Sequence, residues 1–161
     1  NAKIDKSGTD WDEIDYKSGL SIGYRFRIKK PAPQSFHYDM DLNIGAKFWK
    51  SSRYRNATDG NPYIYMSSNG ILLTSVGITA NYSLFNKCSV GLGMEPAYYF
   101  RPNMNEIKNK FDIPLVAKVA YDLKVVEVGI VGKYGTVNLF ETEYMKSGKI
   151  REIQLSLFIP F

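Results

Sequence analysis

The sequence has very little histidine or cysteine. Its 161 residues include one histidine, His37, and one cysteine, Cys88. A lone cysteine cannot form a disulfide within the chain, so cysteine usage does not identify the redox compartment. Without a second histidine or clustered cysteines, the sequence also lacks the ligand spacing of a zinc site. We therefore expect no metal and no other cofactor.

Long hydrophobic runs are also missing. No apolar run approaches the ~18 residues that a membrane helix needs, and no segment shows the helical period of 3.6 residues. The net charge is only +5, and basic residues alternate with acidic ones along the chain. A nucleic-acid-binding surface would need a clustered basic patch. The sequence thus excludes helical membrane spans and gives no support to nucleic acid as a partner.

Strict alternation of apolar and polar residues is what the sequence has in abundance. It is cleanest over residues 35–50, where every even position from Phe36 to Phe48 is apolar. A period of two predicts a β-strand with one apolar face. Seven segments show this pattern: 18–30, 35–50, 71–84, 88–100, 111–121, 125–136 and 153–161. Residues 11–16 are a weaker candidate. We expect a single all-β domain over residues 1–161.

The other face of these strands carries glycine, serine and charges of both signs. We expect ten of the charged residues to form a network inside a barrel lumen: Arg25, Arg27, Asp39, Asp41, Lys47, Glu95, Asp112, Lys118, Glu127 and Lys133. Buried charges need partners, and this set nearly neutralises itself.

Volume favours placing the apolar face outside. The eight-stranded core of a β/α barrel holds roughly twelve side chains, far fewer than the apolar faces supply here. Only lipid tolerates so much exposed apolar surface. Two alternatives stay open at this point: a soluble lipocalin-like barrel with its apolar side inward, and a two-sheet sandwich.

Two further patterns fit a membrane barrel. Connections alternate between short ones and long ones, the long ones being 51–70, 101–110 and 137–149. An alternative for 51–70 is that the flanking strands continue into it as a projecting hairpin. Outer-membrane barrels combine short periplasmic turns with longer extracellular loops, and carry an aromatic girdle at each interface. Rings near the short turns are Phe26, Phe36, Tyr38, Tyr82, Phe85, Tyr121 and Phe161. Rings near the long loops are Phe48, Trp49, Tyr98, Phe100, Phe111 and Tyr134.

The final strand closes on an aromatic residue. Its alternating apolar residues are Ile153, Leu155, Leu157, Ile159 and Phe161. Together with Lys17-Ser18-Gly19-Leu20-Ser21-Ile22-Gly23 and Phe111-Asp112-Ile113-Pro114-Leu115, they resemble the small outer-membrane β-barrel family common in Bacteroidetes. The resemblance implies residence in the bacterial outer membrane with a periplasmic C-terminus. It also implies that the barrel-insertion machinery reads the last strand as its signal.

Strand parity raises one question. Bacterial single-chain barrels have an even number of strands. We therefore expect an eight-stranded, up-and-down barrel, and the seven predicted strands do not include its first strand. That strand is lost from this sequence, lies upstream of it, comes from another chain, or is a poor strand within 9–16. Because the sequence begins at Asn1 without a leader-like segment, we expect a processed or truncated chain and favour loss of the strand.

For function, we expect a structural or surface-binding barrel rather than an enzyme, with a lumen plugged by charge. Arginine and tyrosine dominate binding hot spots, so the contact candidates in the first long loop are Arg53, Arg55, Tyr63 and Tyr65. The partners would be outer-membrane lipid and a protein or other surface molecule. The alternatives are a narrow pore, a lipid-modifying enzyme centred on His37, and a soluble ligand-binding barrel.

Overall fold

The computed structural model describes residues 11–28, 34–55, 63–85, 87–100, 109–142 and 145–159, and its regular structure there is entirely β-strand. The strands are β1 (Trp11–Ile28), β2 (Phe36–Arg55), β3 (Tyr63–Ser83), β4 (Cys88–Met94), β5 (Ala97–Phe100), β6 (Phe111–Asp112), β7 (Leu115–Asp122), β8 (Glu127–Tyr134), β9 (Phe140–Thr142), β10 (Met145–Gly148) and β11 (Arg151–Phe158). Within these residues no helix could span a membrane.

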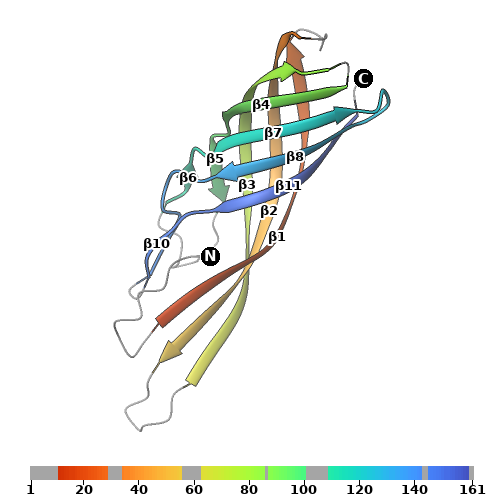
Figure 1. The fold of residues 1–161 in the computed structure, drawn as a ribbon. Helices are drawn as coiled ribbons and strands as arrows, with labels where there is room; N and C mark the ends of the chain where they lie inside the picture. Colours follow the sequence, from red (N-terminus) through yellow and green to blue (C-terminus); the bar gives the residue numbers. More distant parts are fainter. Residues whose placement is uncertain are drawn as a thin grey trace.

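One antiparallel sheet dominates the molecule. Its strand order is β1-β2-β3-β4-β7-β8-β11, with β5 paired to β3 and β6, and β9 and β10 forming a small separate hairpin (Figure 1). Each strand on the main path pairs with the next strand of that path, and the path follows the order of the chain, as in an up-and-down arrangement. The all-β, antiparallel prediction is therefore confirmed.

Two predicted strands are each divided at a proline. The segment 88–100 becomes β4 and β5, with Pro96 between them, and 111–121 becomes β6 and β7, with Pro114 between them. Proline cannot donate a backbone hydrogen bond to a ladder. The carbonyl of a proline can still accept a hydrogen bond: the Glu95 N–H donates to the Pro114 oxygen at 2.9 Å.

The first three strands are much longer than the alternation predicted. β1 begins at Trp11, paired opposite Tyr54, so the idea of a separate first strand in 9–16 is wrong for the part that the structure describes. β2 and β3 extend through most of the expected 51–70 loop as a projecting hairpin. Similarly, the expected 137–149 loop contains the β9–β10 hairpin.

Differences in strand length divide the molecule into a region where all seven strands of the main path lie side by side and a projecting region formed by β1–β3. β1, β2 and β3 have 18, 20 and 21 residues, whereas β7, β8 and β11 have 8 each. A membrane-spanning strand needs about 9–11 residues. The excess lets β1–β3 continue well beyond the other strands, toward the bottom of Figure 1.

The sheet does not close on itself through hydrogen bonds. β1 and β11 are the two ends of the strand path, and because seven strands alternate in direction, the two edges run parallel to each other. The sheet nevertheless curls, since Arg25 on β1 donates to Glu127 on β8 at 2.8 Å, across the space enclosed by the strands.

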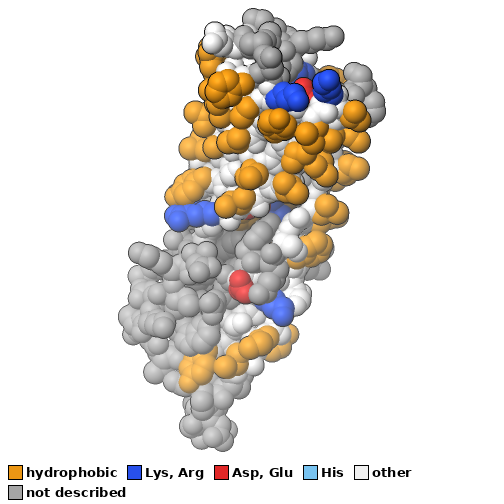
Figure 2. Space-filling model, turned by 45° about the vertical axis from the view of Figure 1, so that its right-hand side comes forward, with side chains coloured by type: hydrophobic (Ala, Val, Ile, Leu, Met, Phe, Trp, Pro, Cys, Tyr) orange, Lys and Arg blue, Asp and Glu red, His pale blue; other side chains and the backbone are white. Residues whose placement is uncertain are grey.

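The two faces of the curled sheet differ sharply. On β11 the outward side chains Ile153, Leu155 and Leu157 are 83%, 73% and 68% exposed. Figure 2 shows such hydrophobic side chains gathered over the upper half of the molecule. The charged side chains of Asp39, Lys118 and similar residues are buried. The apolar face therefore points outward and the charged face inward.

Two bands of outward rings lie near the ends of this apolar surface. Phe36 and Phe85 at the short turns, and Phe48 and Phe100 toward the long connections, are all exposed. Trp49 was also placed in the outer girdle, and that placement is wrong: it is 1% exposed and lies inside. Its odd position on β2 gives it the inward orientation of Asp39 and Lys47.

Candidate functional site

The inner face carries a compact group of three cations and three anions. The Arg25 Nε lies 2.6 Å from Asp41, and the Arg27 Nε lies 2.6 Å from Asp39. Both arginines also reach Glu127, each at 2.8 Å. Residues of β1, β2 and β8 are thus joined across the interior although β1 and β8 are not paired strands.

Lys118 of β7 completes this first group. Its Nζ lies 3.2 Å from Asp39 and 2.9 Å from Glu127. Its side chain is almost fully buried, as are those of both carboxylates. Desolvated ions of this kind are tolerable only when each has close counter-charges. The three cations and three anions of this group provide them for one another.

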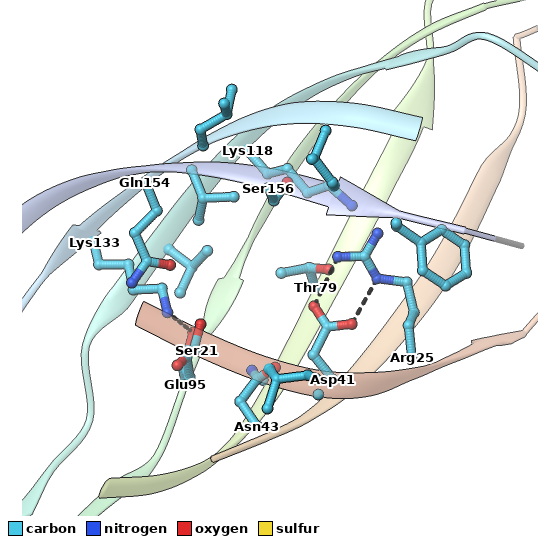
Figure 3. Close-up of a pocket in the computed structure, with 18 of the residues that line it drawn as sticks. Ser21, Arg25, Asp41, Asn43, Thr79, Glu95, Lys118, Lys133, Gln154 and Ser156 are labelled. Carbon is cyan, nitrogen blue, oxygen red and sulfur yellow. Dashed lines mark hydrogen bonds and ion pairs between the residues drawn. The ribbon is translucent and has the colours of Figure 1, made fainter. Parts of the chain in front are cut away.

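A second ion-pair group lies further along the inner face of the sheet, toward the long connections. Lys133 pairs with Glu95, and Lys47 pairs with Glu152 at 3.0 Å. Gln154 donates to Glu152 at 2.7 Å. In Figure 3 the Lys133–Glu95 pair and the Arg25–Asp41 pair lie on either side of a polar interior space.

Sequence reasoning missed two members of this interior, Glu152 and Phe158. Both lie on the polar side of the last strand, whereas the sequence-based prediction used only the apolar side of that strand. The Phe158 ring lies 4.7 Å from the Arg25 guanidinium and 5.3 Å from that of Arg27, in cation–π geometry. The even positions of β11, opposite the alternating apolar residues, were the available signal.

Asp112 does not join the ion pairs of the network in which we expected it. Its Oδ1 accepts hydrogen bonds from the backbone N–H groups of Ile113, Thr136 and Val137, at 2.8 to 3.0 Å. The residue is fully buried. A carboxylate bonded to several backbone donors holds a chain segment in place, so Asp112 anchors the segment after β8.

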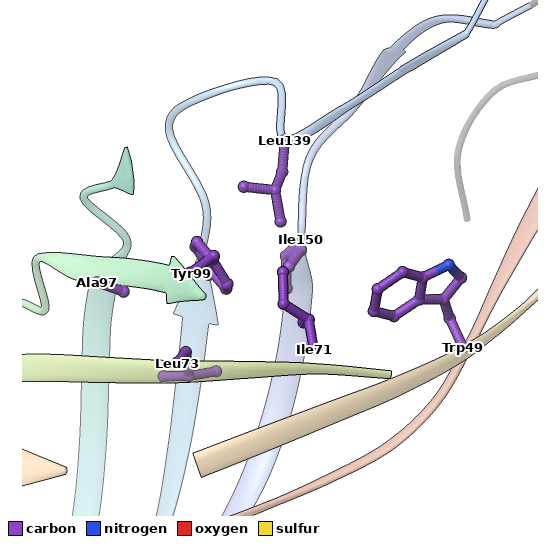
Figure 4. Packing of buried hydrophobic residues seen from close by; sticks show 7 residues of the cluster. All are labelled: Trp49, Ile71, Leu73, Ala97, Tyr99, Leu139 and Ile150. Atoms are coloured by element: carbon purple, nitrogen blue, oxygen red, sulfur yellow. The ribbon is translucent and has the colours of Figure 1, made fainter. Parts of the chain in front are cut away.

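An apolar cluster lies on the inner face of the curled sheet, at the end of the long connections. Its members come from β2, β3, β5 and the segments flanking β9–β10, and Figure 4 shows them at close range. They are Trp49, Ile71, Leu73, Ala97, Tyr99, Leu139 and Ile150. Tyr99 and Leu139 are completely buried. Dense apolar packing excludes water from the cluster itself.

A polar cavity lies between the ion pairs of the described residues. Its volume is about 230 Å³, and its wall includes small side chains such as Ser21, Gly77 and Ser156. It lies between the first and second ion-pair groups, with Arg25 and Lys133 both in its lining. The cavity is therefore bounded by charges already engaged with one another.

His37 lies on the inner face of the sheet near the short turns and is fully buried. Neither ring nitrogen has a hydrogen-bond partner among the described residues. A catalytic histidine needs a nucleophile and an orienting carboxylate within reach. The nearest carboxylate along its strand, Asp39, is instead held by Arg27 and Lys118.

The four contact candidates lie opposite one another on the projecting hairpin. Arg53 faces Tyr65 in the register, and Arg55 faces Tyr63. Tyr65 is 61% exposed, and Arg53 is half-buried. The side chains of Arg55 and Tyr63 lie outside what the structure describes, as does Phe161 of the terminal signal.

No family model matches the chain, and no curated protein or solved structure matches it.

Proposed function

We propose that the protein is an integral β-barrel of the bacterial outer membrane, with a plugged lumen and a structural or surface-binding role. The observation that carries this proposal is the orientation of the sheet: outward aliphatic and aromatic side chains are exposed, while arginine, lysine, aspartate and glutamate pair inside. A water-soluble protein would gain by the opposite arrangement, because apolar burial is its main driving force. Hydrocarbon is the environment in which this orientation is favourable.

The resemblance of the terminal strand supports the same compartment. Ile153, Leu155, Leu157 and Ile159 all lie on the outward face. That is the side on which an insertion signal would be read and on which lipid would later lie. Since the short turns would face the periplasm, the projecting parts of β1–β3 would extend outside the cell.

The occupied interior supports a plugged lumen, and therefore a barrier rather than a pore. The apolar cluster and both ion-pair groups occupy successive levels of the interior. We expect the protein to insert into planar bilayers without resolvable single-channel steps. Recording at both voltage polarities, with insertion verified by protease protection, measures this directly. Large, stable conductance steps would instead support the narrow-pore alternative.

The projecting hairpin provides the surface for a binding role. Exposed Tyr65 lies opposite Arg53 beyond the region of the shorter strands. These are residue types that often anchor protein contacts. A lipid-modifying activity has weaker support, since His37 lies at the end of the lumen away from these projections and its neighbour Asp39 is engaged in ion pairs.

An eighth strand would complete the barrel. Open sheet edges do not occur in hydrocarbon, and β1 and β11 present two such edges. A cleft of about 510 Å³ separates them, lined by Ser18–Ser21 on one side and Arg151–Leu155 on the other. Because these edges run parallel, one strand antiparallel to both fits between them. A strand that precedes β1 and joins it by a reversing connection would have this direction.

Cysteine pairs across the cleft test the eighth strand. Strands lie about 4.8 Å apart, so an intervening strand puts β1 and β11 about 9–10 Å apart, beyond the ~4.4–6.8 Å Cα separation of a disulfide. In a Cys88→Ser background of the protein as made in cells, we expect no disulfide from Leu20→Cys with Ile153→Cys or with Leu155→Cys. The control pair, Ile130→Cys with Leu155→Cys, are register partners and should cross-link. A disulfide between Leu20→Cys and either β11 position would show direct closure by seven strands.

A further inference from the structure

The outward face has a hollow over β7 and β8. The register aligns four outward residues in a row that is large at both ends and small in the middle: Leu92, Ala117, Gly132 and Ile153. The hollow above this row has a volume of about 640 Å³, within the range of roughly 300–1,000 Å³ typical of small-molecule sites. Its shape therefore comes from two small side chains on neighbouring strands.

A cation stands at the long-loop rim of this hollow. Arg151 is exposed, and its guanidinium lies 4.9 Å from the centre of the Tyr134 ring. One of its amino groups donates to the Tyr134 hydroxyl at 3.3 Å. A guanidinium has five N–H donors in a planar fork, so Tyr134 can position it while other donors bind an anion.

A second hollow on the outward face repeats the combination. It has a volume of about 560 Å³ and lies over β2, β3 and β5. Ala46 and Gly70 are its small residues, Phe48 and Phe100 are among its aromatic walls, and the exposed Lys110 lies in its lining. Two separate hollows thus each join an apolar surface to a cation near the long-loop end.

We propose that each hollow binds an acyl chain of an anionic membrane phospholipid or glycolipid, with the lipid's phosphate on Arg151 in one hollow and on Lys110 in the other. The inference rests on the proposed function, because it takes hydrocarbon to cover this face. An acyl chain fits a hollow made by small side chains, and arginine binds phosphate with paired hydrogen bonds. The lipids would belong to the leaflet on the side of the long loops.

The test uses the detergent-purified full chain and native mass spectrometry. It is titrated with phosphatidylglycerol or phosphatidylcholine of identical acyl chains, so that only headgroup charge differs. We expect wild type to retain phosphatidylglycerol more tightly, by about fivefold for each cation near the headgroup. Arg151→Gln with Lys110→Gln should remove this preference and leave phosphatidylcholine binding unchanged. Lys87→Gln, an exposed charge at a short turn, is the matched control and should keep the preference.

A second variant tests the hollow itself. Gly132→Leu should remove one bound lipid of either headgroup, because the side chain would fill the hollow. The substitution is sterically possible, since a Cβ there meets only the Ala117 carbonyl oxygen, at 3.9 Å. Val90→Leu, on the outward face away from the hollow, should change nothing.

The outcomes separate this inference from the proposed function. Equal retention of both lipids by wild type, or an unchanged preference in the double glutamine variant, would overturn the lipid sites while the protein still required detergent. If wild type stays monodisperse in buffer without detergent, the membrane assignment fails together with the lipid sites.

Discussion

Replacing Asp39 with alanine is expected to destabilise the protein, folded in lipid vesicles, by about 3–5 kcal/mol. Asp39 is buried and pairs with both Arg27 and Lys118. Its removal leaves two desolvated cations that share only the remaining carboxylates of the group. The free energy of unfolding, measured by urea titration in lipid vesicles, gives the cost.

A double-mutant cycle with Lys118→Met provides the control. If the two side chains act as a pair, the double variant should be more stable than the sum of the single effects predicts, by about 0.5–3 kcal/mol. Removing Lys118 relieves the excess positive charge that Asp39→Ala creates. A cost below about 1 kcal/mol for Asp39→Ala, with simple additivity in the double variant, would show that the interior charges are solvated like surface ion pairs.

The sequence predicted the two faces of the sheet well, because the side-chain period of a strand is two. Every inward ion pair described here joins residues on the polar side of the alternation, such as Arg25 with Asp41. Alternation does not show whether an inward residue lies in the ionic or in the apolar part of the interior. Trp49 and Tyr99 belong to the inward face, but nothing local in the sequence says that their level is apolar whereas that of Asp39 is ionic.

Strand ends were harder to predict for a related reason. Residues 11–17 alternate poorly although Trp11–Tyr16 pair with β2. The proposed membrane location would account for this, because beyond the apolar band no hydrocarbon would require one side of a strand to be apolar. Their strand conformation comes from the register with β2, a non-local cause. Conversely, Pro96 and Pro114 interrupt segments whose alternation looks continuous.

Placing an arginine in the middle of the outward band tests most directly whether hydrocarbon covers this face. Ile44 is 67% exposed and lies on β2 about midway between the outer rings Tyr38 and Phe48. An arginine at the bilayer midplane of a barrel costs about 2–4 kcal/mol, whereas an exposed position in water tolerates it within about 0.5 kcal/mol. The same face continues beyond the band at exposed Ser68 on β3, which is the matched control.

The measurement is the free energy of unfolding of Ile44→Arg and Ser68→Arg in lipid vesicles. We predict a loss of about 2–4 kcal/mol for Ile44→Arg and less than about 0.5 kcal/mol for Ser68→Arg. If both variants unfold like wild type, water covers the outward face and the membrane assignment is wrong.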